Sequence, residues 1–194
     1  MSTFSLYFNL GLTHILDIRG YDHILFVVAL CALYMLRDWR KVLILVTAFT
    51  IGHSLTLVLA TLNILRVNAA LIEFLIPVTI FVTAISNILR GQKNFSQTKA
   101  HLNYAYALFF GLIHGMGFSN YLRSLLGREE SITVPLLAFN LGLELGQVVI
   151  VAIVLVAASV FVSILNVSRR DWKIVLSSAI AGIALTLMTE AKFW

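Results

Sequence analysis

The chain has 194 residues, of which 60% are apolar and only 12% are charged, and its mean hydropathy is +0.94. An ordinary soluble domain carries about 25% charged residues, so this composition indicates an integral membrane protein. A membrane-spanning helix needs about 20 mostly apolar residues. The length therefore allows six or seven spans, leaves no room for an appended soluble enzyme module, and predicts one integral-membrane domain over 1–194.

The charged residues are distributed as membrane topology requires. Fourteen Lys and Arg against nine Asp and Glu give a formal charge of +5, and the cationic residues form short clusters between apolar runs. Such clusters are typical of cytoplasmic loops rather than of a nucleic-acid-binding face. Cys31 is the single cysteine, which excludes a disulfide or a thiolate metal cluster within a monomer.

The apolar runs predict one short helix and six full spans. A helix over Phe4–Ile18 would reach about 22 Å against a hydrocarbon core of about 30 Å. It therefore either spans the membrane with the polar residues at its ends snorkelling to the interface, or forms a re-entrant segment. The full spans are expected at Tyr21–Leu36, Val42–Leu62, Ala69–Leu89, Leu102–Leu122, Ile132–Phe161 and Trp172–Thr189. The predicted fold is an all-α polytopic transmembrane bundle of seven helices.

The loops between these spans alternate in basic content. The basic loops contain Arg37, Arg40 and Lys41, then Arg90, Lys93 and Lys99, then Arg169, Arg170 and Lys173. The intervening loops contain Arg66, and Arg123 and Arg128 with Glu129 and Glu130. Because basic loops face the cytoplasm, we expect a cytoplasmic N-terminus and an extracytoplasmic C-terminus.

Ionisable groups inside a bilayer are costly and are usually functional. The predicted spans contain His14, Asp22, His23, His53, Glu73, His114, Asn140, Glu144, Gln147 and Glu190. Four of the five histidines belong to this set; His101 lies in a basic loop. With the predicted orientation, the set falls between the outer interface and the middle of the bilayer, which indicates one shared site. Glu190 is interpreted as reaching the outer interface.

Neutral imidazole and carboxylate without thiolate suit zinc, nickel, copper or iron. The candidate metal ligands are His14, Asp22, His23, His53 and His114. They outnumber the ligands of a tetrahedral ion, so some would orient the others through hydrogen bonds. Glu73, Asn140, Glu144 and Gln147 are candidates for such support or for proton exchange. An ordinary interhelical hydrogen bond remains the alternative for His53, which has Thr50, Ser54 and Thr56 nearby.

Two spacings predict how helices pack and which faces are polar. Asn140, Glu144 and Gln147 are spaced i, i+4, i+7 and form one polar stripe. Gly142 with Gly146, and Gly111 with Gly115, give the small-xxx-small spacing of close helix pairs. We therefore expect these glycines to serve helix packing, which would hold His114 beside Gly115 in a fixed place.

Several blocks in this order resemble the HupE/UreJ family of bacterial membrane proteins, in its branch with a DHILF motif. The blocks are GLTHILDIRGYDHILFVVAL (11–30), VTAFTIGHSLTL (46–57), the span with Glu73, FGLIHGMGF (110–118) and FNLGLELGQ (139–147). The resemblance implies a protein of the bacterial cytoplasmic membrane that takes up nickel or a related divalent ion. By motif position it places His14, Asp22 and His23 in the first signature, and His114 in the second.

Three functions are compatible with these residues. The first is a transporter of a divalent transition metal, nickel or zinc, although the inner halves of the spans offer the ion only hydroxyl, phenol and amide groups, such as Thr79. The second is a membrane-embedded zinc hydrolase or transferase acting on lipid or a membrane-anchored peptide, in which Asp22 or Glu144 is the general base of a metal-bound water. The third is an assembly protein. The expected partners are lipid and metal, with no nucleic acid.

Overall fold

The computed structural model describes residues 2–65, 67–90, 100–126 and 131–191. These residues form α-helices and no strand, which confirms the all-α prediction. The helices are α1 (Thr3–Leu16), α2 (Asp22–Cys31), α3 (Trp39–Thr61), α4 (Ala69–Leu89), α5 (Ala100–Leu126), α6 (Thr133–Ser159) and α7 (Arg169–Glu190). A short 3-10 turn precedes α3, and a π-helical turn over Val160–Ile164 extends α6.

Among the described residues, four helices are long and apolar enough to cross a membrane. They are Leu36–Thr61, Ala69–Leu89, Thr133–Ile164 and Arg169–Glu190. The predicted full span at Tyr21–Leu36 is wrong, because α2 has ten residues and ends at Cys31. Ten helical residues reach about 15 Å, half of the hydrocarbon core. α5 is helical over the whole of the range predicted for its span.

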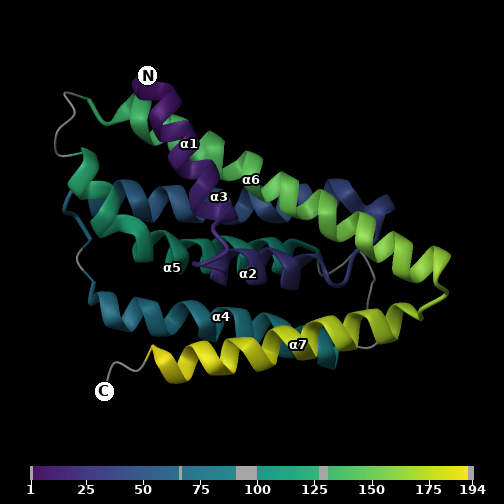
Figure 1. The fold of residues 1–194 in the computed structure, drawn as a ribbon. Coiled ribbons are helices and arrows are strands. Elements are labelled where there is room, and N and C mark those ends of the chain that lie inside the picture. Colours follow the sequence, from purple (N-terminus) through teal and green to yellow (C-terminus); the bar gives the residue numbers. More distant parts are fainter. Residues whose placement is uncertain (1, 66, 91–99, 127–130, 192–194) are drawn as a thin grey trace.

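α1 and α2 together take the place of one span (Figure 1). α1 runs parallel to α6, since Phe8 contacts Gly142 and Ile15 contacts Gly146. α1 ends at Leu16 inside the bundle, and α2 continues from there toward the opposite end. α1 therefore begins at the end of the bundle where α7 finishes, whereas the sequence predicts that the two termini face opposite sides of the membrane.

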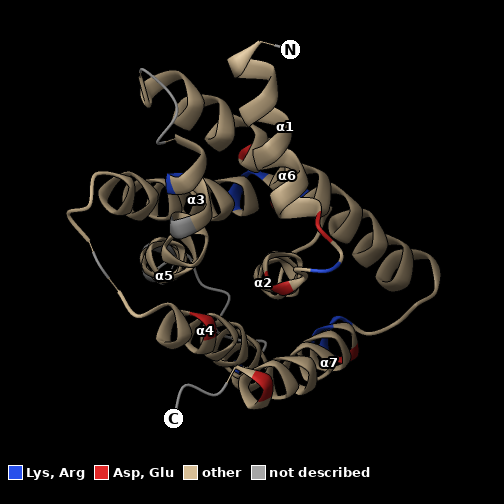
Figure 2. Cartoon of the chain, turned by 60° about the vertical axis from the view of Figure 1, so that its left-hand side comes forward, with Lys and Arg blue, Asp and Glu red and all other residues tan. Residues whose placement is uncertain are grey.

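α2 lies in the centre of the bundle, where Figure 2 shows it end-on among the longer helices. Its apolar residues fill the core; Phe26 and Val27, for example, are buried. Its last turn is held by α4, because the Asn87 side-chain amide donates to the Ala29 carbonyl at 2.7 Å. The same carbonyl accepts from the Ala32 backbone N–H at 3.3 Å, so the amide of Asn87 adds a second donor at the end of this short helix.

Glycines bring two parallel helix pairs into backbone contact. In the α3–α5 pair, a methyl group at Gly111 would strike the Phe49 carbonyl, and one at Gly115 would strike the His53 carbonyl. In the α1–α6 pair, Gly142 packs in the same way against Phe8. The prediction that these glycines serve close packing is confirmed, and the packing fixes the backbones that carry His53 and His114.

Basic residues gather at one end of the bundle. Arg37, Arg40 and Lys41 flank the start of α3, Arg90 follows α4, and Arg169 and Arg170 open α7. These three places lie at the end of the bundle opposite the start of α1 (Figure 1). Of the other residues used to predict topology, Lys173 lies near the start of α7 and Arg123 in the last turn of α5. Outside the described residues lie Arg66, Lys93, Lys99, Arg128, Glu129 and Glu130.

Candidate metal centre

Histidines from four helices meet inside the bundle. His14 lies in the last turn of α1, His23 is the second residue of α2, and His53 and His114 belong to α3 and α5. One ring nitrogen from each of His14, His23 and His53 lies within 4.8 Å of the other two. The His114 ring lies beside that of His23, with 5.2 Å between centroids. Residues far apart in sequence thus present imidazoles to one small volume.

The histidine nitrogens are buried and largely unpartnered. His53 and His114 are fully buried, and His23 is 5% exposed. Among the described residues, His14 Nε2, His23 Nε2, both ring nitrogens of His53 and His114 Nδ1 have no hydrogen-bond partner. Each buried unpaired polar group costs about 1–3 kcal/mol. Five such atoms therefore lie in one cluster with unused hydrogen-bonding or ligand capacity.

Neither ring nitrogen of His53 has a hydrogen-bond partner among the described residues, so the interhelical hydrogen bond considered for it is not formed there. The Thr50 hydroxyl contacts the Val46 carbonyl and the Gln147 side chain, and the Ser54 hydroxyl donates to the Thr50 carbonyl. The Thr56 hydroxyl donates to main-chain carbonyls of its own helix. These hydroxyls leave the His53 ring free to bind another group.

Asp22 orients His23. Asp22 Oδ1 lies 3.1 Å from His23 Nδ1 and also accepts the His23 backbone N–H at 2.9 Å. Because a carboxylate only accepts, His23 carries its proton on Nδ1 and presents the lone pair of Nε2 to the cluster. A carboxylate that holds a metal-binding imidazole in this way fixes its tautomer and raises its basicity.

Thr79 orients His114, a role that sequence analysis missed. The Thr79 hydroxyl donates to the Ile76 carbonyl at 2.7 Å and lies 3.0 Å from His114 Nε2. With its proton committed, the hydroxyl accepts from Nε2–H, so that Nδ1 of His114 has a free lone pair. Thr79 therefore lies at the level of the cluster and not on the inner path where the predicted spans placed it. The register of α4 against α5, which could have revealed this, is not readable from one sequence.

Aromatic rings enclose the imidazoles. The centroid of the Phe118 ring lies 4.0 Å from that of the His14 ring, and the centroid of the Phe139 ring, on α6, lies 5.8 Å from it. Phe26 and Phe49 pack against His114 at 4.9 and 5.1 Å between centroids. These rings surround the imidazoles with apolar surface and limit the rotamers that the histidines can adopt.

The polar stripe of α6 faces α3, one to two turns from His53. Glu144 Oε1 accepts from the Thr47 hydroxyl at 2.6 Å, and Gln147 Oε1 accepts from the Thr50 hydroxyl at 2.7 Å. Within the described part of the chain, Asn140 Oδ1, Glu144 Oε2 and Gln147 Nε2 are buried without a partner. The stripe thus forms polar contacts with a neighbouring helix, and some of its donor and acceptor atoms remain without a hydrogen bond to the described residues.

Glu73 lies apart from the stripe, beside a cleft. The cleft has a volume of about 360 Å³ and lies among the α1–α2 linker, α4 and the end of α7. Its polar lining consists of Arg19, Tyr21, Asp22, Glu73 and Glu190. Asp22 is therefore shared between the cleft and the histidine cluster.

Apolar helices of membrane-spanning length, packed around a histidine cluster with a hydrogen-bonded carboxylate, define an integral membrane protein with a candidate metal centre. The family model described as HupE / UreJ protein matches residues 1–191. The chain belongs to the HupE/UreJ family, and the predicted resemblance is confirmed. No curated protein and no solved structure matches the chain.

Proposed function

We propose that this protein transports a divalent transition-metal ion, nickel or zinc, across the bacterial cytoplasmic membrane. The ion would bind His14, His23 and His53, with His114 beside them and Asp22 behind His23. The observation that carries the proposal is the group of five buried imidazole nitrogens without partners. Membership of a family named for HupE and UreJ, which is associated with nickel uptake, supports the same class of substrate.

The orientation follows from the basic end of the bundle. Cytoplasmic segments are enriched in Lys and Arg, so the end with Arg37, Arg90 and Arg169 would face the cytoplasm. The start of α1 and the end of α7 would then both face outward. His53 lies eight residues before the end of α3 and is nearer this outer end. The ion would bind in the outer half of the bilayer.

The donor set suits the proposed ions. Neutral imidazole binds nickel, zinc and copper well, and the absence of a thiolate at the cluster disfavours soft monovalent copper. Three histidine nitrogens leave at least one coordination position open. A transported ion needs such a position, because its ligands must be exchanged as it enters and leaves.

Asp22→Asn tests the role of the carboxylate behind His23. The amide keeps the size of the side chain but removes the charge that fixes the His23 tautomer. We expect metal affinity to fall about 10- to 100-fold, measured by isothermal titration with Ni²⁺ or Zn²⁺ in detergent. Asp17→Asn is the matched control, since Asp17 is exposed and accepts the Arg19 backbone N–H rather than a histidine. Equal affinity in the two variants would contradict the role assigned to Asp22.

Transport is tested directly in sealed vesicles. We expect purified protein in liposomes to carry Ni²⁺ or Zn²⁺ inward to a trapped metal-sensitive dye, and His23→Ala to reduce the rate to that of empty liposomes. The vesicles are scored for insertion by protease access from outside. Correctly inserted, metal-binding protein that gives no flux would refute transport.

A metal-dependent enzyme is the second candidate, and the cleft beside the three histidines favours it. An open position on zinc would hold a water, whose pKa such a site lowers toward 7. Asp22 lines the cleft and is better placed as a general base than Glu144, which bonds Thr47 across the α3–α6 contact. Zinc-loaded protein incubated with bacterial lipids, with lipid products followed by mass spectrometry, tests this function; a product absent with His23→Ala would favour it.

A further inference from the structure

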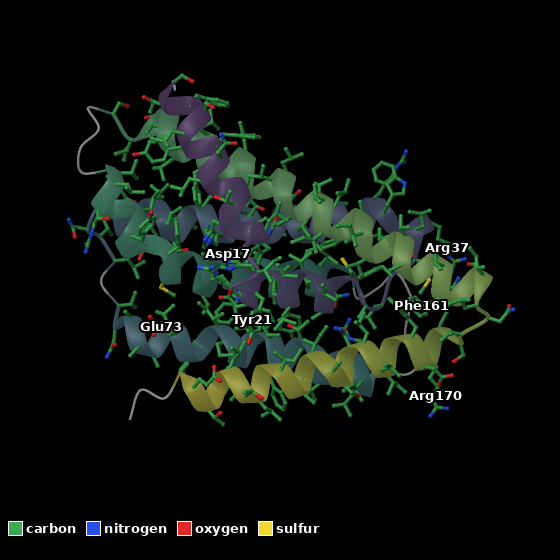
Figure 3. All side chains as sticks on the ribbon, viewed as in Figure 1. Asp17, Tyr21, Arg37, Glu73, Phe161 and Arg170 are labelled. Atoms are coloured by element: carbon green, nitrogen blue, oxygen red, sulfur yellow. The ribbon has the colours of Figure 1, made fainter. Side chains whose placement is uncertain are left out.

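The cleft between α4, α7 and the α1–α2 linker lies at the end of the bundle opposite the basic residues. Glu73 is in the second turn of α4, and Glu190 is the last residue of α7. Figure 3 labels Glu73 and Tyr21 on either side of the space between α4 and the start of α2, and Figure 2 shows acidic segments on α2, α4 and α7. The opening is therefore on the side of the bundle from which the proposed substrate arrives.

The charge of the cleft suits a cation. Among the described residues that line the cleft, three carry carboxylates (Asp22, Glu73 and Glu190) and one carries a guanidinium (Arg19). A concave surface with an excess of one charge, set between low-dielectric walls, raises the local concentration of counterions and their rate of association. Glu73 and Glu190 are exposed, so their charge can act on ions in the cleft without supporting the fold.

The wall of the cleft is joined to the histidine cluster by hydrogen bonds. The Asp22 side chain is 27% exposed whereas that of His23 is 6% exposed, so Asp22 stands between the cleft and the buried ring. Behind it, His23 Nε2 is buried without a partner among the described residues. On the α4 wall, the Ile76 carbonyl accepts from the Thr79 hydroxyl that orients His114.

Two sides of the cluster are covered by closely packed helix pairs. α3 and α5 meet at Gly111 and Gly115, directly beside His53. α1 and α6 meet at Gly142 and Gly146, on the side of His14. On the side of α2 and α4, by contrast, a cavity adjoins Asp22, the residue that orients His23.

We propose that this cleft is the vestibule through which a divalent cation reaches the histidine cluster, and that Glu73 and Glu190 accelerate its entry electrostatically. The inference rests on the proposed function in taking the cation as substrate. It adds two residues, Glu73 and Glu190, that act on the rate of entry without coordinating the ion at the cluster. Asp22 links the two regions.

The test measures the rate at which Co²⁺ reaches the cluster in the full-length protein in detergent. Co²⁺ bound by imidazole absorbs visible light, so its association can be followed by stopped-flow absorbance. We expect Glu73→Gln combined with Glu190→Gln to slow association about tenfold while the final spectrum and stoichiometry stay unchanged. Raising ionic strength should slow the unmodified protein more than the double variant. Asp171→Asn, which removes an exposed carboxylate at the basic end, is the matched control and should leave the rate unchanged.

A cysteine introduced by Glu73→Cys distinguishes the effect of side-chain charge on the association rate from the effect of side-chain shape. Cys31 is fully buried, so Glu73→Cys places one accessible thiol in the cleft. Two methanethiosulfonate reagents of similar size are then compared, one bearing a sulfonate and one a trimethylammonium group. The sulfonate should restore the association rate toward that of the unmodified protein, and the trimethylammonium group should slow it further.

The outcomes distinguish the two proposals. An unchanged rate in the double variant, or the same effect from both reagents, overturns the vestibule even if the protein transports metal. A slowed rate with charge-dependent rescue supports the vestibule, and absence of flux in vesicles would then refute transport alone. Failure of the unmodified protein to bind Co²⁺, Ni²⁺ or Zn²⁺ overturns both.

Discussion

Replacing His53 by leucine is expected to weaken metal binding more than 100-fold while leaving the metal-free protein as stable as before, or more stable. Both ring nitrogens of His53 are buried without a partner among the described residues. Loss of an orienting residue already costs 10- to 100-fold in affinity, so loss of a ligand should cost more. An apolar side chain of similar size removes two unsatisfied polar atoms and so relieves a cost of about 1–3 kcal/mol each.

Weaker metal binding together with unchanged or higher stability of the metal-free protein is expected of a metal ligand and not of an ordinary core residue. Metal affinity is measured by titration, and stability by the temperature or denaturant midpoint of the metal-free protein. His101→Leu, at the histidine outside the cluster, should leave metal affinity unchanged. Retained affinity in His53→Leu would remove His53 from the site, and marked destabilisation of the metal-free variant would show that its ring supports the fold.

Gly111→Ala is expected to disrupt the α3–α5 pair. The added methyl group would meet the Phe49 carbonyl, which lies on a helix backbone and cannot move aside. The helices must separate, at a cost of about 1–3 kcal/mol or more, and the shift would carry Phe49 and His53 away from the cluster. We therefore expect lower thermal stability and weaker metal binding together.

Gly182→Ala is the matched control for this variant. Gly182 lies inside α7, and a methyl group there would meet nothing within 4 Å. The same chemical change should stabilise α7 by up to about 1 kcal/mol through helix propensity. Comparable losses in the two variants would contradict the assignment of Gly111 to a backbone contact.

The sequence predicts the helices and the residues of the cluster because both depend on local patterns. Apolar runs define α3, α4, α6 and α7 within a few residues, since the bilayer demands a minimum length of apolar helix. The intramembrane histidines stand out because each would be costly without a partner. Small-residue spacing likewise predicts the close helix pairs, since only glycine lets two backbones touch.

The path of the first 31 residues could not be predicted in the same way. Hydropathy does not distinguish two helices that cross in opposite directions from two half-length helices in succession. The prediction placed His14 and His23 at the outer interface, whereas the structure places them where α1 and α2 meet inside the bundle. The signal that decides between the two paths is the end of α2 at Cys31, which depends on packing against α4 and not on local propensity.

The hydrogen bonds that orient the histidine rings also could not be predicted from the sequence. Thr79 and His114 are 35 residues apart, and their contact depends on the register between α4 and α5. The pairing of Glu144 with Thr47, 97 residues away, has the same origin. Side chains that support a site from another helix carry no local pattern, so coordinates are needed to find them.

The break between α1 and α2 also brings the negative end of one helix dipole and the positive end of another together at the heart of the bundle. His14 lies in the last turn of α1, where the free carbonyls give a partial negative charge that favours a cation. Asp22 lies in the first turn of α2, where the free amide groups favour an anion. The interruption therefore lets the main chain itself stabilise a bound cation and the carboxylate behind His23, which an unbroken helix through the same volume would not do.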